Sequence, residues 1–269
     1  MRLSAALIGL ALAPTHSFAD ELNEGEAAGP DGAAASATAK PIRWNVELKR
    51  QNTDRATPDE STRTTLRLEA YPAGGSFTLL RLDLPFPDDK TTFGGDLFDP
   101  RPGDLKVKAK WRPFEAGGHS LVASLELTFP TARPESLGTG KVQVAPGLET
   151  VMPLGSLRAG SAIHEFSFAP LVRQIVSVAG DPDSKDINYT KIELAVRDAW
   201  RSDFSLKLTL KPVIDWKQDG NTAAVAELEG AWTFESGWHA SLMGGARAWG
   251  GSVPSTYDRR LELTVGRRF

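Results

Sequence analysis

The sequence predicts an all-β protein in which residues 41–269 form a single antiparallel transmembrane β-barrel of about twelve strands. Three observations predict this fold: an N-terminal export signal, segments in which apolar and polar residues alternate, and tryptophans at the ends of those segments. Alternation with a period of two is typical of a strand with one apolar face, and a tilted strand crosses a membrane in about ten residues.

The N-terminus has the features of a secretory signal peptide. Arg2 precedes an apolar run from Leu3 to Ala13, and Ser17-Phe18-Ala19 fits a small-x-small cleavage site. The run is too short to span a bilayer as a helix, so residues 1–19 are predicted to be removed on export. Residues 20–40 are acidic and rich in Ala, Gly and Ser. They contain too little apolar surface to offset the entropy of ordering, and we expect a disordered tail.

Composition excludes several classes of protein. The 269 residues contain no cysteine, which excludes a disulfide framework and zinc–thiolate sites. The formal net charge of −3 gives no basic balance that points to nucleic acid as a partner. No later stretch reaches the roughly 18 apolar residues of a membrane helix. An exported chain of this kind is therefore periplasmic, secreted or a barrel.

Twelve alternating segments distinguish these possibilities. The segment 104–113 sets Leu105, Val107, Ala109 and Trp111 on one face, and lysines and an arginine on the other. The predicted strands are 43–49, 62–71, 77–86, 104–113, 119–129, 141–152, 162–178, 188–199, 204–216, 223–234, 238–249 and 256–269.

The connections alternate in length. Those after even-numbered strands are mostly short, such as Pro72-Ala73-Gly74-Gly75, whereas those after odd-numbered strands are mostly longer and more polar, such as 87–103. Membrane barrels show this asymmetry, with the short turns on the periplasmic side. A soluble β-sandwich has no reason to alternate in this way.

Aromatic residues mark both predicted rims, as an indole or phenol ring does at the headgroup level. The predicted periplasmic belt is Trp44, Tyr71, Trp111, Trp200, Phe204, Trp232, Trp238 and Phe269, and the predicted outer belt is Phe86, Phe129, Trp216, Trp249 and Tyr257.

The chain ends on an alternating segment, and Phe269 is its last residue. This ending resembles the C-terminal signal that the outer-membrane assembly machinery reads in bacterial barrels. We therefore expect a location in the outer membrane of a Gram-negative cell. The expected partners are outer-membrane lipid, the barrel-assembly machinery and a small-molecule solute.

The middle of the chain is similar to one family. Gly103-Asp104-Leu105-Lys106-Val107-Lys108, Leu127-Thr128-Phe129-Pro130-Thr131, Leu137-Gly138-Thr139-Gly140 and Val144-Ala145-Pro146-Gly147-Leu148 resemble motifs of the outer-membrane transporter family named for the meta-pathway of phenol degradation. The resemblance covers residues 80–155. It implies an outer-membrane channel, often associated with small aromatic or hydrophobic compounds, and carries no catalytic residue.

Strand parity identifies the side chains that face the lumen, and basic residues outnumber acidic ones among them. The lumen-lining candidates are Arg67, Arg81, Asp83, Lys106, Lys108, Lys110, Arg112, Lys207, Lys211, Glu227, Glu229, Arg247, Arg260 and Glu262. One reading is a channel for passive passage of small solutes, aromatic or anionic, in which Lys106, Lys108 and Lys110 line an anion-favouring path. The other is a barrel that is plugged by its own ion pairs. A twelve-stranded barrel lies between side-chain-filled and open sizes, so strand number does not decide.

A third and weaker alternative is an outer-membrane lipid hydrolase. His239-Ala240-Ser241 places a histidine and a serine on one strand face, and His164 with Ser167 is a looser pair. Parity turns His239 and Ser241 inward, whereas a lipid hydrolase needs them to face lipid, and His164 falls on the apolar parity of an interfacial residue. We expect no enzyme activity, no cofactor and no metal site. The acidic segment 181–186 is expected to be a solvated loop.

Overall fold

The computed structural model describes residues 42–54, 60–73, 76–87, 101–133, 135–159, 162–200 and 203–269. The predicted signal peptide, the predicted tail and most of the 87–103 connection lie outside these residues. Within the described ranges, no helix is long and apolar enough to cross a membrane. The described helix η1 (Glu135–Leu137) is a single 3-10 turn.

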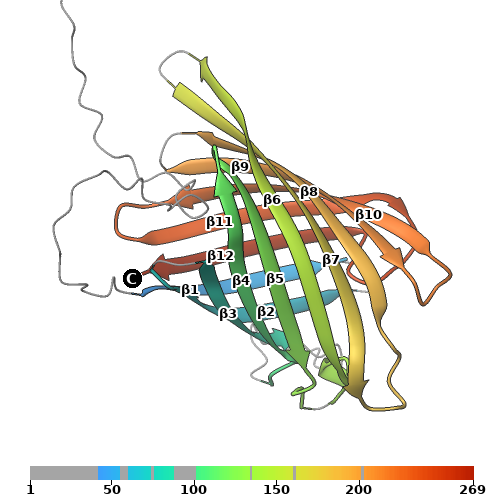
Figure 1. Cartoon of the computed structure of the whole chain (residues 1–269). Coiled ribbons are helices and arrows are strands. Elements are labelled where there is room, and N and C mark those ends of the chain that lie inside the picture. Colours follow the sequence, from blue (N-terminus) through green and yellow to red (C-terminus); the bar gives the residue numbers. More distant parts are fainter. Residues whose placement is uncertain are drawn as a thin grey trace, which may run out of the picture.

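Twelve described strands form one closed antiparallel barrel, which confirms the predicted fold (Figure 1). Each strand pairs with its neighbours in sequence, and β1 pairs with β12. At this seam the Phe269 N–H donates to the Trp44 carbonyl at 2.9 Å. The strands are β1 (Arg43–Thr53), β2 (Ser61–Tyr71), β3 (Phe77–Pro87), β4 (Leu105–Ala116), β5 (His119–Phe129), β6 (Lys141–Ala159), β7 (Ala162–Gly180), β8 (Asn188–Trp200), β9 (Phe204–Asp215), β10 (Asn221–Thr233), β11 (Trp238–Gly250) and β12 (Arg259–Arg268).

The turns keep the predicted asymmetry. Gly117 and Gly118 alone join β4 to β5, and both have positive φ angles (58° and 77°), as a two-residue hairpin turn requires. The β6–β7 hairpin differs from the prediction because both strands continue to a two-residue connection. A register shift between Pro153 and Gly155 inserts an extra residue without ending the ladder. The hairpin therefore extends beyond the neighbouring strands (Figure 1).

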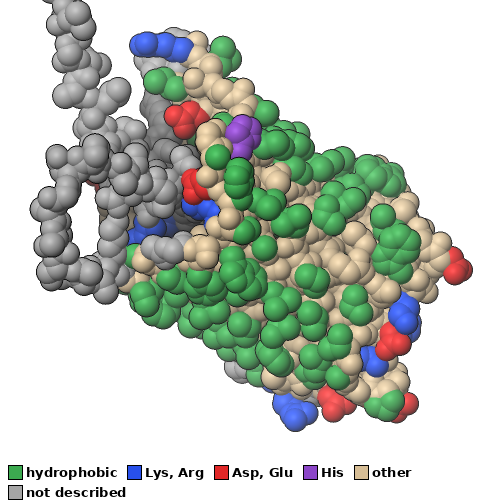
Figure 2. Space-filling view, in the orientation of Figure 1, with side chains coloured by type: hydrophobic (Ala, Val, Ile, Leu, Met, Phe, Trp, Pro, Cys, Tyr) green, Lys and Arg blue, Asp and Glu red, His purple; other side chains and the backbone are tan. Residues whose placement is uncertain are grey.

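The outer surface of the barrel is apolar. Leucines on alternate positions of neighbouring strands remain exposed, including Leu48, Leu80, Leu208 and Leu261, and hydrophobic side chains cover the wall seen in Figure 2. All seven tryptophans are also exposed, by 37% to 51% of their surface, and all but Trp111, which lies within β4, are at strand ends. Exposed apolar side chains between two aromatic rims match a wall that faces lipid.

Part of the periplasmic belt forms a continuous stack of rings. His164 stacks on Trp200 with ring centroids 5.1 Å apart, and Trp200 meets Phe204 edge-on at 6.1 Å. Phe204 then lies 5.1 Å from Trp232. The side chains come from β7, β8, β9 and β10, so the stack runs around the barrel rather than along a strand.

The placement of Tyr257 in the outer belt was wrong. Tyr257 is 1% exposed, and its hydroxyl donates to a carboxylate oxygen of Glu227 at 2.5 Å inside the barrel. The reason is that β12 begins at Arg259, so Tyr257 belongs to the loop 251–258, where strand parity does not apply. This loop folds into the mouth of the barrel, and its Val253 packs against buried Val213 of β9.

Candidate functional site

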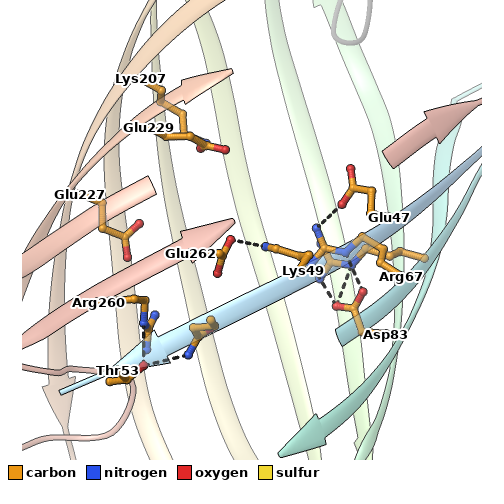
Figure 3. A network of polar contacts seen from close by, with 12 residues as sticks. Glu47, Lys49, Thr53, Arg67, Asp83, Lys207, Glu227, Glu229, Arg260 and Glu262 are labelled. Atoms are coloured by element: carbon orange, nitrogen blue, oxygen red, sulfur yellow. Dashed lines mark hydrogen bonds and ion pairs between the residues drawn. The ribbon is translucent and has the colours of Figure 1, made fainter. Parts of the chain in front are cut away.

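The candidate site is the charged lumen, and its first part is an ion-pair network on β1, β2 and β3. Two nitrogens of Arg67 contact the two carboxylate oxygens of Asp83 at 2.7 and 3.3 Å. Arg67 also lies 3.3 Å from Glu47, and Arg81 contacts Asp83 at 3.2 Å. Figure 3 shows Glu47, Arg67 and Asp83 projecting together into the barrel. These contacts hold both arginines in fixed positions against the wall.

The network continues to β5, β6 and β7. Glu126 accepts from Arg81 at 3.0 Å and pairs with Arg173 at 3.6 Å, which joins β3, β5 and β7. Lys110 of β4 reaches Glu149 of β6 at 3.0 Å. One of the three lysines assigned to the anion-favouring path is therefore neutralised by a carboxylate.

The other half of the wall carries separate pairs. Lys207 pairs with Glu229 and Lys211 with Glu227, in each case between β9 and β10. Glu262 of β12 pairs with Lys49 of β1 at 2.6 Å (Figure 3).

Five lumen-lining candidates remain. Two of them lie toward the ends of the barrel wall, one lies in its middle, and two lie at the outer mouth. Arg112 pairs with Glu115 at 2.9 Å on β4, near its periplasmic end, and Arg247 pairs with Asp258 of the loop 251–258 at 2.6 Å. Lys108 is 4% exposed and lies in the middle of the barrel, where it forms no ion pair with any described residue. Lys106 and Arg260 line the outer mouth.

These ion pairs follow the wall. Every pair recorded between lumen-facing side chains of the described residues joins positions on one strand, on adjacent strands or on strands one apart. A plug held by ion pairs needs contacts between opposite walls. The recorded ion pairs therefore follow the wall of the lumen.

Cavities lie at both ends of the lumen. The outer vestibule has a volume of about 900 Å³ and shares Arg63 and Lys106 with a deeper cavity of about 130 Å³. On the periplasmic side, cavities of about 240 and 340 Å³ share Ser167 and Arg197. Arg81, Lys108, Glu126 and Arg173 line none of these four cavities, so this charged group separates the outer pair from the inner pair.

Sequence reasoning missed several charged residues of the lumen, among them Glu47, Lys49, Arg63, Glu149 and Arg173. Arg63 shares the parity of Arg67 on β2, and Glu47 alternates with the apolar Val46 and Leu48 on β1, so the same rule would have found both. Glu149 and Arg173 lie on β6 and β7, where prolines and glycines interrupt the alternation and hide the inward face.

Neither of the two histidine–serine pairs suggested by the sequence forms a lipid hydrolase site. His239 lies inside the barrel, 3.1 Å from Glu47 of β1, and Glu47 is already paired with Arg67. His164 pairs with Asp198 at 2.9 Å on the outer face, whereas Ser167 lines the periplasmic cavities, so His164 and Ser167 lie on opposite faces. Neither pair combines a lipid-facing serine with a neighbouring histidine base.

The acidic outer loop is occupied by its own contacts. Asp181 accepts from the Asp183 N–H and the Ser184 hydroxyl, both at 3.0 Å, and these bonds lower the pKa of its carboxyl. Lys141 and Lys217, at 3.2 and 3.3 Å, lower the pKa of Asp186 in the same way. Among the described residues, no group of three potential metal ligands exists.

Comparisons with known proteins support the fold. No protein-family model matches the chain, and no curated protein matches it, so the resemblance at residues 80–155 stays a prediction. Several solved structures are similar. The COG4313 outer membrane channel from Pseudomonas putida F1 superimposes with a TM-score of 0.58 at 16% identity, over 88% of this chain and all of that one. The KdgM porin gives a TM-score of 0.57 at 9% identity, over 84% and 99% of the two chains. The NanC porin gives 0.55 at 8%, over 83% and 97%. The chain has the fold of outer-membrane channels.

Proposed function

We propose that the protein is an outer-membrane channel for passive passage of small solutes and that it favours anions. The observation that carries the proposal is the charged lumen, in which ion pairs follow the wall and cavities enter from both ends. Such a wall presents polar groups to water and to a hydrated solute, while the apolar exterior meets lipid.

The fold is compatible with this role. Proteins with the same fold include channels and porins, and one of them, the KdgM porin, is described in complex with disordered oligogalacturonate. That ligand belongs to KdgM. For this chain, the described lumen is lined mainly by charged and polar side chains, which favours charged solutes over neutral aromatic compounds.

The preference for anions follows from the basic residues that remain unpaired. Lys108 lies in the charged group between the two sets of cavities and forms no ion pair among the described residues. Arg81, Arg173 and Lys108 share the single carboxylate of Glu126 at this point, so basic side chains are in excess there, and this excess attracts anions and repels cations as they pass. Lys106 acts in the same sense at the outer mouth.

Planar-bilayer recording of the purified protein under a potassium chloride gradient tests this proposal. We expect discrete conductance steps and a reversal potential that shows preference for chloride. Lys108→Gln should shift the reversal potential toward cations, and its removal leaves no carboxylate without a partner. Lys185→Gln removes the same charge from an exposed outer loop and should leave the potential unchanged. Absence of conductance, or cation preference that Lys108→Gln does not alter, would contradict the proposal.

Assembly gives a second prediction. Phe269 is 65% exposed at the periplasmic rim, and its backbone bonds to Trp44 do not depend on its ring. Because assembly machinery reads the terminal aromatic, Phe269→Ser should lower the amount of folded barrel in outer-membrane fractions, measured by heat-modifiable migration on gels. Phe234→Ser removes a similarly exposed ring from the same rim and should have a smaller effect. Equal losses would mean that Phe269 acts only as a rim residue.

A further inference from the structure

The outer vestibule has an excess of positive charge. Its charged side chains are Arg63, Lys106, Lys191, Arg260, Asp54 and Asp104. Lys191 pairs with Glu193 at 3.1 Å on the same strand and is thereby compensated. Arg63, Lys106 and Arg260 form no ion pair with any described residue.

The two vestibule carboxylates are already bound to loop backbone. Asp54 accepts from the N–H groups of Asp258 and Arg259, both at 2.7 Å, and so ties the β1–β2 loop to the start of β12. Asp104 accepts from the N–H and the hydroxyl of Thr139 at 2.6 and 2.8 Å. Both acids therefore serve as loop anchors, and neither pairs directly with the three basic side chains.

The three cations come from different strands and line the same cavity. Arg63 lies on β2, Lys106 on β4 and Arg260 on β12, so they form an arc on one side of the vestibule. A guanidinium offers a planar pair of donors that fits a carboxylate or phosphate, and an ammonium adds a compact charge. Such a set matches the oxygens of an organic anion better than it matches a neutral solute.

Tyr257 holds Arg260 in this arc. The guanidinium carbon of Arg260 lies 3.8 Å from the centre of the Tyr257 ring, and Nε donates to the Thr53 hydroxyl at 3.4 Å. The ring is itself fixed by its bond to Glu227 and by close contact with Gly245, where a Cβ atom would overlap the tyrosine hydroxyl. The loop 251–258 thus helps to orient Arg260 of β12.

We propose that Arg63, Lys106 and Arg260 form an oxyanion-binding station at the outer mouth, which captures small organic anions bearing carboxylate or phosphate groups before they pass, with Tyr257 as a positioning residue. The station rests on the proposed channel function and deepens it, because it adds a saturable binding step to a general preference for anions.

Citrate, a small tricarboxylate, is the probe. Added to either side of a bilayer that contains the channel, it should reduce chloride conductance in a saturable manner, and at lower concentration from the side of the vestibule. Arg63→Gln and Arg260→Gln should each weaken this block about tenfold, the loss expected for one charge-assisted contact. Lys185→Gln carries the same charge change on the same side of the membrane, outside the vestibule, and should leave the block unchanged.

Two neighbouring glycines test the positioning role. Gly245→Ala should displace Tyr257 and weaken the citrate block several-fold, although no vestibule charge is altered. Gly244→Ala adds the same methyl group on the opposite face of β11, where nothing lies within 4 Å, and should leave the block unchanged. Equal effects of the two substitutions would exclude Tyr257 from any role in the station.

Failure of the station is distinguishable from failure of the channel. If the protein conducts but citrate does not block it in a saturable manner, the binding station is refuted and the channel function is not. The same holds if Arg63→Gln and Arg260→Gln leave the block intact. Absence of conductance overturns the channel, and titration calorimetry of citrate into detergent-solubilised protein then decides the station by itself. Heat of binding that is lost in both arginine variants supports it, and absence of binding heat in the parent protein overturns it.

Discussion

Leu208→Arg is expected to lower the free energy of unfolding of the barrel in a lipid bilayer by about 2–4 kcal/mol. Leu208 lies on the outer face of β9, 56% exposed, between the rim residues Phe204 and Trp216. A guanidinium at this depth must leave water for hydrocarbon, with no described acid on the outer face of β9 to pair with it. Reversible unfolding in lipid vesicles by guanidinium chloride, followed by tryptophan fluorescence, measures the change.

The same substitution discriminates between a wall that meets lipid and one that meets water. On a water-exposed strand, replacing an exposed leucine by arginine changes stability by only about 0.5 kcal/mol. Leu208→Ala removes the leucine without adding charge, so its cost should be well below that of Leu208→Arg. If the two variants unfold at the same denaturant concentration in vesicles, the outer face of β9 does not lie in hydrocarbon.

The barrel could be predicted because lipid outside and water inside impose one period on every strand. On β4 this constraint is direct: the residues from Leu105 to Trp111 alternate without exception, and the structure keeps each on the expected side. Connection lengths and rim aromatics add independent information, since they depend on the direction of each strand relative to the membrane.

The pairing of the lumen charges could not be predicted in the same way. Lys110 finds Glu149 across the intervening strand β5, and Arg81 finds Glu126 across β4. These contacts depend on the stagger between strands that are distant in sequence, and no local spacing encodes that stagger. Parity therefore identifies which side chains face inward but does not show which of them stay uncompensated.

Tyr257 shows a second limit. Its position near the end of an alternating segment matches a rim residue. Residues 256–258 belong to a loop instead of to β12, and the side chain of Tyr257 turns into the barrel. The sequence feature related to this placement is Gly245, one of two adjacent glycines on β11. Its lack of a side chain makes room for the Tyr257 ring. A glycine within a strand indicates that another group approaches the backbone closely, but the sequence does not identify that group.

Wall-following ion pairs have a consequence for both stability and selectivity. Because most of these pairs link strands one or two positions apart, the charges that line the lumen also tie the strands together. A substitution that breaks a pair should therefore change the two properties at once. The strongest case is Glu126, whose carboxylate pairs with both Arg81 and Arg173.

Glu126→Gln is expected to lower the free energy of unfolding by about 3 kcal/mol and to increase the preference for anions. Glu126 contacts Arg81 at 3.0 Å and Arg173 at 3.6 Å, and it lies opposite Lys108 in the β4–β5 register. Its removal leaves three cations close together in the middle of the barrel, where breaking a partly buried pair costs about 3–5 kcal/mol before allowance for water in the lumen. Denaturant unfolding in vesicles and reversal potentials in planar bilayers measure the two effects.

The double variant Arg81→Gln/Glu126→Gln separates pairing from loss of the side chain. It removes one charge of each sign and leaves Asp83 paired with Arg67, so it should recover part of the lost stability and return the reversal potential toward that of the parent. Glu262→Gln, which removes a carboxylate paired with Lys49 alone, provides the matched control, because Glu126 pairs with two cations. If Glu126→Gln and Glu262→Gln cost the same and shift the reversal potential equally, the central charged group has no special part in stability or selectivity, and each lumen pair acts independently.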